Sequence, residues 1–159
     1  MITDIFGTEI VPGSMLQVFR NYGAIFVVTH KTPSSVVGYY FNEHELIFKP
    51  YKSYSRVTSG VVSGVIIDKT LPQEILKKKE EFLIKLGEEN TIKKELSKLE
   101  KKLNKKGGKV VLEGIKYRYL GITFRKNLDK EITVLLRTEG NRPDKEITVE
   151  KFKQLVNEA

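Results

Sequence analysis

Apolar and β-branched residues in the first part of the chain occur in short runs separated by turn residues. Met15 to Arg20 alternates as a strand, Asn21 to Gly23 has turn chemistry, and Ala24 to Thr29 returns as a second strand. Further strand-like runs follow at 36–42, 46–48 and 57–68, the last of them bent at its glycines. Five short strands in under sixty residues predict a small, closed β-barrel.

A stretch rich in Lys, Glu and Leu covers residues 72–106 and gives the clearest helical pattern in the chain. Its apolar residues share a seven-residue spacing at Ile75, Phe82, Leu96 and Leu103. Gly87, followed by polar residues, matches a helix stop, and Thr91 is a suitable cap for a second helix. The pattern allows one long helix or a helical hairpin, and we favour the hairpin because an interior glycine costs about 1 kcal/mol.

The rest of the chain alternates strand-like runs with turns and ends in a helix. The runs lie at 110–112, 115–124 and 132–136. Residues 139–144 form a loop in this interpretation, and Thr148 caps the final helix. The predicted fold is mixed β and α+β: a barrel over 1–70, then a helical hairpin and a small domain with a three-stranded antiparallel sheet and a terminal helix over 71–159.

The opening hairpin carries a resemblance to a known class of domains. Gly13 precedes an apolar strand, a tight turn ends at Gly23, and the apolar run Ile25 to Val28 follows. This pattern resembles the KOW and Tudor class of SH3-like barrels over roughly the first 40% of the chain, and it departs from that class at Ser14, where an acidic residue is frequent. The resemblance implies a barrel that binds DNA, RNA or protein.

The chain has a net charge of +8 and a sequence pI near 9.5. Residues 1–71 contribute +1, residues 72–108 contribute +4 and residues 109–159 contribute +3. Such an excess is typical of proteins with a polyanionic partner, with solubility as the alternative explanation. In length, basic charge and lack of cysteine, the whole chain is similar to the small early DNA-binding proteins of T-even bacteriophages. That similarity implies an effect on host or viral DNA or its transcription.

Catalytic chemistry has little support in the sequence. His30 and His44 are the only histidines, there is no cysteine, and neither a nucleophile elbow nor a phosphate-binding loop is present. His44 lies between two glutamates, but neighbours on a strand point to opposite faces, so we interpret it as an exposed turn residue. We expect a non-enzymatic protein with no cofactor, no metal and no small-molecule substrate.

The lack of cysteine also indicates a reducing compartment. No leader or membrane-spanning segment stands out in the sequence. We therefore expect a soluble protein of the host cytoplasm, associated with the nucleoid and not with a membrane.

Aromatic and basic residues interleave in the barrel region. Candidate DNA contacts there are Arg20, Tyr22, Lys31, Lys49, Lys52, Tyr54 and Arg56. Basic side chains would contact phosphates, while tyrosines would pack on sugars or bases. For any one aromatic residue, burial in the barrel is the competing interpretation, above all for Tyr40, Phe41 and Phe48. An aromatic cage for a methylated side chain is a third.

A second cluster of candidate DNA contacts lies in the C-terminal region, at Lys116, Arg118, Arg125 and Lys126. Strand alternation places Lys116 and Arg118 on one face of a sheet and Tyr117 and Tyr119 on the other. A half-buried sheet needs a polar face in any case, so a solvated surface is an equal alternative to a phosphate contact.

These patterns favour a protein that binds double-stranded DNA largely through electrostatic attraction and with little sequence preference. The alternative is a KOW/Tudor-like module that binds RNA or protein, with host nucleoid or transcription proteins as candidate partners.

Overall fold

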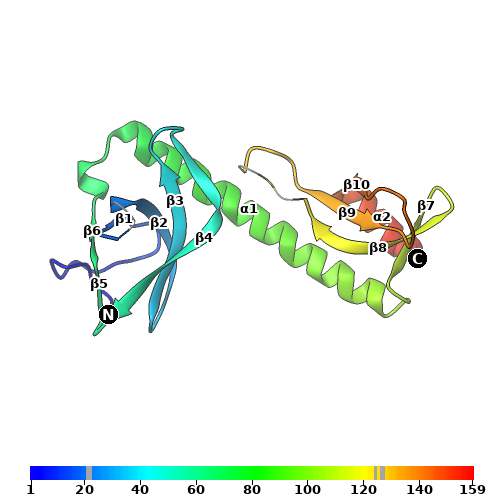
Figure 1. The fold of residues 1–159 in the computed structure, drawn as a ribbon, viewed down its shortest axis with the longest axis horizontal. Coiled ribbons are helices and arrows are strands. Elements are labelled where there is room, and N and C mark those ends of the chain that lie inside the picture. Colours follow the sequence, from blue (N-terminus) through cyan, green and yellow to red (C-terminus); the bar gives the residue numbers. More distant parts are fainter. Residues whose placement is uncertain (21–22, 124, 126–127) are drawn as a thin grey trace. The chain divides into compact units, whose positions relative to one another are not determined.

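The structure is a computed structural model that describes residues 1–20, 23–123, 125 and 128–159, and the side chain of Tyr51 is also outside the description. The chain forms two units, Met1–Ile84 and Lys85–Ala159. Helix α1 (Gln73–Asn104) is continuous across the division and contributes residues to each unit (Figure 1).

The first unit is built on a six-stranded antiparallel sheet in the order β5-β4-β3-β2-β1-β6. Its strands are β1 (Met15–Val18), β2 (Ile25–Thr32), β3 (Ser35–Asn42), β4 (Ile47–Thr58), β5 (Val61–Val62) and β6 (Gly64–Ile66). Strands β5 and β6 are consecutive in the chain yet lie at opposite edges of the sheet, so the sheet curls round into a nearly closed barrel (Figure 1). A 3-10 turn at Asp68–Thr70 leads into α1. The predicted barrel-like arrangement of strands is confirmed, but the single bent strand predicted at 57–68 is wrong, because that stretch holds the end of β4, then β5 and β6, and the start of the 3-10 turn.

Strand β4 is much longer than the predicted strand at 46–48. Tyr39 pairs with Lys52 while Phe41 pairs with Phe48, so β4 has two more residues than β3 over this stretch. Pro50 lies within this irregularity, where its missing N–H leaves the ladder on either side intact. The predicted strand ended at residue 48, two residues before this proline, which is uncommon within strands.

The interior of the barrel is a closely packed apolar cluster. Its buried members are Ile10, Leu16, Val18, Phe26, Val28, Val36 and Val62. Gly38 on β3 is required by this packing, because a Cβ there would lie 2.1 Å from the Val27 carbonyl oxygen and 2.3 Å from the Phe26 ring. Phe26 in turn meets Tyr40 edge to face, with ring centroids 6.1 Å apart.

The first turns of α1 pack on the outside of the barrel. The Phe82 ring stacks on Phe48 with centroids 4.8 Å apart and meets Tyr39 at 5.4 Å. Lys79 Nζ donates to the Gly13 carbonyl oxygen at 3.0 Å and to Asp68 Oδ2 at 3.1 Å. This part of the helix therefore belongs to the first unit.

The second unit packs two helical segments on a four-stranded antiparallel sheet in the order β10-β9-β8-β7. Its elements are β7 (Lys109–Leu112), β8 (Ile115–Ile122), β9 (Thr133–Arg137), β10 (Lys145–Thr148) and α2 (Val149–Glu158). The core joins Leu96, Leu99 and Leu103 of α1 to Phe152 of α2 and to the inner face of the sheet.

The prediction of three strands in this unit was wrong, because β10 adds a fourth. It is a short edge strand in which three of four residues are exposed, so its sequence, Lys145-Glu-Ile-Thr148, has no apolar alternation to reveal it. The predicted cap of the last helix is confirmed: the Lys151 N–H donates to Thr148 Oγ1 at 3.1 Å.

The preference for a helical hairpin was also wrong, because α1 is one helix of 32 residues. Thr91 does not cap a second helix; its hydroxyl donates to the Gly87 carbonyl oxygen one turn earlier, at 3.0 Å. Glu89, which resembled part of a polar stop, is buried and paired with Arg125 and Lys93. In the described part of the chain, no helix combines the length and apolarity needed to cross a membrane.

Two glycine-to-alanine variants should have opposite effects on stability. Gly38→Ala should destabilise the first unit by about 1–3 kcal/mol, because the new methyl group overlaps backbone and the Phe26 ring. Gly87→Ala should stabilise the second unit by about 0.5–1 kcal/mol, because no atom outside the local helix lies within 4 Å of the new group and alanine favours the helix. Scanning calorimetry of both variants tests this, and a loss of stability in Gly87→Ala would contradict a continuous α1.

Candidate nucleic-acid interface

Three candidate residues of the barrel lie on the outward face of β4. Lys52, Tyr54 and Arg56 alternate with Ser53 and Ser55, and only the first three are exposed, Tyr54 by 65%. Alternate residues of a strand are about 6.7 Å apart, so the row Lys52-Tyr54-Arg56, which we call the β4 row, extends about 13 Å. It presents a cation, an aromatic ring and a second cation to solvent.

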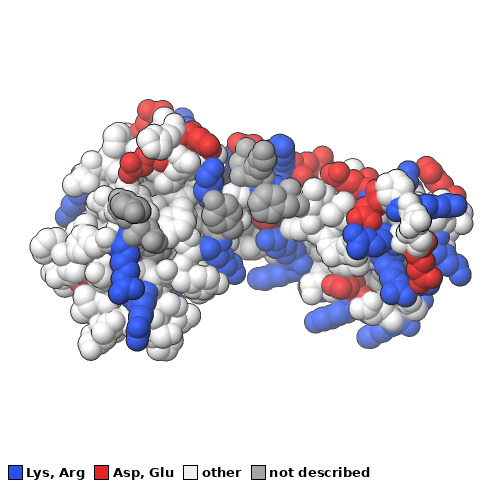
Figure 2. All heavy atoms as spheres, in the orientation of Figure 1, with Lys and Arg blue, Asp and Glu red and all other residues white. Residues whose placement is uncertain are grey.

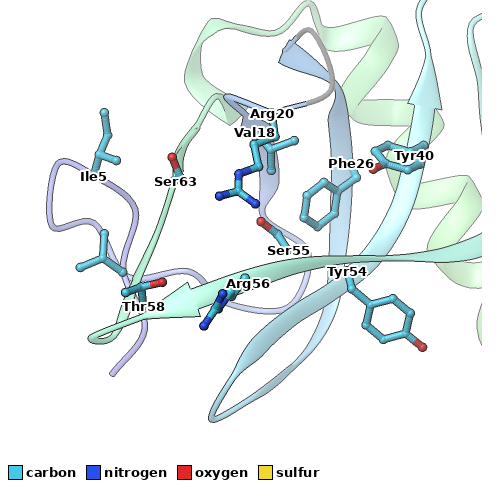
Figure 3. A pocket seen from close by; sticks show the side chains of 11 residues that line it. Ile5, Val18, Arg20, Phe26, Tyr40, Tyr54, Ser55, Arg56, Thr58 and Ser63 are labelled. Carbon is cyan, nitrogen blue, oxygen red and sulfur yellow. The ribbon is translucent and has the colours of Figure 1, made fainter.

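Tyr54 and Arg56 of the β4 row line a hollow of about 630 Å³ at one end of the barrel, which we call the barrel hollow. Its floor is formed by Val18, Phe26 and Tyr40, which belong to the barrel core or pack against it. Seen from close by, the floor lies between the end of β1 and the middle of β4 (Figure 3). The barrel hollow therefore lies at one end of the barrel over an apolar base, in which Val18 and Phe26 are buried and Tyr40 is half-buried.

Two arginines stand at the barrel hollow, one inside it and one at its edge. The Arg20 side chain extends into the hollow toward Ser55, and the Arg56 side chain lies at the outer edge beyond β4 (Figure 3). Neither guanidinium forms an ion pair with a described residue, and no Asp or Glu of the described chain lines the hollow. This concave surface therefore has positive charge that the rest of the described chain leaves unneutralised.

The other barrel candidates are less available. Lys31 and Lys49 are half-buried, and their ammonium groups lie 3.9 Å from Glu9 and 3.0 Å from Glu45. Tyr22 lies outside the described residues. Of the aromatic residues interpreted as core, Phe41 and Phe48 are buried with ring centroids 4.9 Å apart, and Tyr40 is half-buried.

In the second unit, three cations stand side by side across the sheet. Lys109 on β7 pairs in register with Arg118 on β8, which pairs with Arg137 on β9. The predicted alternation is confirmed: Lys116 and Arg118 are exposed, whereas Tyr117 is buried and Tyr119 stacks on Phe152 with centroids 4.9 Å apart. We call Lys109, Arg118 and Arg137 the cationic row.

Two carboxylates accept hydrogen bonds from the cationic row. Glu139 Oε1 accepts from Lys109 Nζ at 3.2 Å and from Arg118 Nη2 at 3.1 Å. Asp144 accepts two hydrogen bonds from Arg137, at 2.9 and 3.0 Å. These hydrogen bonds lower the pKa of both carboxyl groups and raise the pKa of Arg137. The row is thus partly neutralised, while Lys116 and Arg142, beside it, form no ion pair with a described residue.

The cationic row, Lys116 and Arg142 line a shallow hollow of about 400 Å³, and Glu139 is the only carboxylate among its described lining residues. The whole unit holds nineteen Lys and Arg against twelve Asp and Glu, a net charge of +7. Figure 2 shows Lys and Arg over much of this unit's visible surface, with Asp and Glu among them. Sequence reasoning missed Lys109, Arg137 and Arg142, because only the strand register brings them beside Arg118.

Arg125 occupies a different environment from the one predicted for a DNA contact. It is 8% exposed, and its Nη2 lies 2.7 Å from Glu89 Oε2. Its Nη1 also donates to the carbonyl oxygens of Leu128 and Lys130. The side chain fastens the segment after β8 to α1, and we leave it out of the interface. The neighbouring candidate Lys126 lies outside the described residues.

The two histidines show no site of their own. Both are exposed, and the His44 N–H donates to Asn42 Oδ1 at 2.9 Å within a turn, as interpreted from the sequence. Among the residues that the structure describes, no group of three His, Asp or Glu side chains is arranged to hold a metal ion.

Comparisons of the chain with protein-family models, with curated proteins and with solved structures found no match. Function is therefore inferred from the geometry and charge of the two cationic surfaces.

The Glu139 carboxyl should titrate below its ordinary pKa of 4.5, chiefly because Lys109 donates a hydrogen bond to it and also through the charge of Arg118. Lys109→Ala should therefore raise this pKa more than Arg118→Ala does, as measured by carbon-detected NMR. The stability that the ionised carboxylate contributes is present above pH 4.5 and is lost as the pH falls through the lowered pKa. A Glu139 pKa that neither variant changes would contradict this geometry.

Proposed function

We propose that the protein is a non-enzymatic DNA-binding protein that holds duplex DNA mainly by its phosphates and with little sequence preference. The observation that carries the proposal is the cationic row of the second unit, with Lys116 and Arg142 beside it around one hollow. Among the described residues, five cations line this hollow with a single carboxylate.

The cationic row does not by itself stabilise the sheet. Like charges directly opposite one another on neighbouring strands destabilise a sheet, and here two such pairs adjoin. Glu139 and Asp144 relieve part of this repulsion in the free protein. A phosphate backbone would relieve the rest, and its binding would release counterions from the DNA, which is the main source of non-specific affinity.

The barrel supports the proposal with fewer charges. Its unit holds nine Lys and Arg against eight Asp and Glu, but Arg20, Lys52 and Arg56 form no ion pair with a described residue. The β4 row would contact about two phosphates through Lys52 and Arg56, with Tyr54 between them. We propose that the barrel belongs to the SH3-like class, with a KOW/Tudor-like opening, because of the strand-turn-strand pattern of its sequence.

We propose in addition that the chain is similar to early proteins of T-even bacteriophages, MotB among them, and that it has a wider role. In this proposal the protein acts in the host cytoplasm on the nucleoid, where it alters host or viral DNA or its transcription. Contacts to phosphates suit such a role, because they position a protein on DNA without reading its sequence.

A second candidate function is protein binding by the barrel. Phe6 and Phe19 are exposed by 76% and 53%, and Ile5 by 45%. The Ile5 and Phe19 N–H groups donate to the carbonyl oxygens of Gly64 and Ser63, which brings these apolar residues to one edge of the barrel. Nuclease treatment before affinity purification separates the candidates, because it releases a partner bridged by DNA and leaves a direct protein contact intact.

Affinity for duplex DNA should fall steeply as salt rises from about 50 to about 200 mM. The variant K116A/R118A/R142A should lower the slope of log affinity against log salt by about two, because Lys116 and Arg142 form no ion pair with a described residue whereas Arg118 is already paired with Glu139 and adds little. The charge-matched control K77A/K101A/K105A removes three exposed lysines outside the hollow and should change the slope much less. Fluorescence anisotropy measures both, and equal effects of the two variants would contradict a localised site.

The barrel contribution can be tested separately with K49A/K52A/R56A. We expect the salt slope to fall by about two, because Lys49 is already paired with Glu45 and adds little. An unchanged slope in the same anisotropy titration would place the whole contact on the second unit.

A further inference from the structure

The barrel hollow differs in kind from the shallow hollow of the second unit. Its floor is apolar, with Val18, Phe26 and Tyr40, whereas charged side chains line most of the other. Contact with duplex phosphates alone would need only the outward β4 row. The barrel hollow therefore offers a surface that a phosphate backbone does not use.

The lining of the barrel hollow combines three kinds of chemistry. The floor suits a flat apolar group, Ser55 and Ser63 bring hydroxyl groups, and Arg20 brings a cation into the hollow (Figure 3). Arg56 adds a second cation at the outer edge. A volume of about 630 Å³ is within the range of about 300–1,000 Å³ that is usual for ligand sites.

The placement of the two arginines favours a chain of phosphates over a single anion. Arg20 and Arg56 extend in different directions, one into the hollow and one along its edge (Figure 3). One carboxylate would occupy one guanidinium and leave the other without a partner. Successive phosphates of one nucleic-acid strand would reach both, with the intervening base next to the apolar floor.

We propose that the barrel hollow receives an unpaired nucleotide of DNA, with its base on the apolar floor and its flanking phosphates at Arg20 and Arg56. In an intact duplex the bases are paired and stacked, and moving one out costs a few kcal/mol. A gap or a single-stranded end has already lost that pairing. The protein therefore prefers DNA that contains unpaired nucleotides to a continuous duplex. This inference rests on the proposed function.

The test compares three DNAs by fluorescence anisotropy: a continuous duplex, the same duplex with a short single-stranded gap, and the gapped duplex with abasic sites in the gap. The abasic DNA keeps the phosphates and the flexibility of the gap but removes the bases. We expect the gapped duplex to bind about 10-fold more tightly than the other two, in line with base contacts in single-strand binding proteins.

Two variants place the effect in the barrel hollow. Ser63→Phe fills the hollow without changing charge, and Arg20→Ala removes the cation that points into it; each should abolish most of the preference for the gap. Ser34→Phe is the matched control, because Ser34 is an exposed turn residue that does not line the hollow. It should keep the preference, and thermal melting of each variant confirms that the barrel is folded.

Equal affinity for the three DNAs, with duplex binding intact, would overturn the inference and leave the proposed function standing. A preference for the gap that survives in both Ser63→Phe and Arg20→Ala would also overturn it, because the bases would then bind elsewhere. Failure of the wild-type protein to bind any of the DNAs would overturn the proposed function itself.

Discussion

Both sheets pack against the residues that recur every seven positions along helix α1, from Ile75 to Leu103, which we call its seam. Small sheets gain stability when a helix packs on an apolar face, and α1 does this for each sheet. In the first unit Phe82 packs on the outside of the barrel, where its ring contacts Tyr39 and Phe48. In the second, Leu96 and Leu103 enter the core beneath the sheet. The seven-residue spacing of the seam therefore serves two cores with one helix.

The same seam explains where charge is buried and where it is free. Glu89 lies on the seam, and a buried carboxylate there is tolerated because Arg125 and Lys93 pair with it. Arg125 is thereby used for folding. Other cations lie around the two hollows. Among the described lining residues, the barrel hollow has two cations and no carboxylate, and the hollow of the second unit has five cations and one carboxylate. Burial thus sorts the basic residues into structural and surface groups.

The sequence pattern predicted the elements whose periodicity is undisturbed: the opening strands, the seam of α1, the alternation at 116–119 and the Thr148 cap. It failed where a tertiary contact outweighs a local preference. Gly87 resembles a helix stop, yet α1 continues through it, and the nearby Glu89 pairs with Arg125 in the second unit. Strand β10 lacks an apolar face, and β4 runs through a proline.

The candidate site divides in the same way. The outward position of Lys52, Tyr54 and Arg56 follows from strand alternation, so sequence reasoning found these residues. The cationic row depends on the pairing of three strands, which no local pattern specifies, and the barrel hollow depends on the closure of the sheet. Arg125 was predicted as a DNA contact because nothing in the sequence indicates that its guanidinium pairs with Glu89 of α1.

The central claim is that DNA contacts these two surfaces and not the basic residues at large. Lysine-specific acetylation followed by mass spectrometry, with and without duplex DNA, tests it most directly. The account predicts that DNA protects Lys52 and Lys116, while the equally exposed Lys77 and Lys105 of the helical region keep their reactivity. Uniform protection of all four lysines, or protection confined to Lys77 and Lys105, would contradict it.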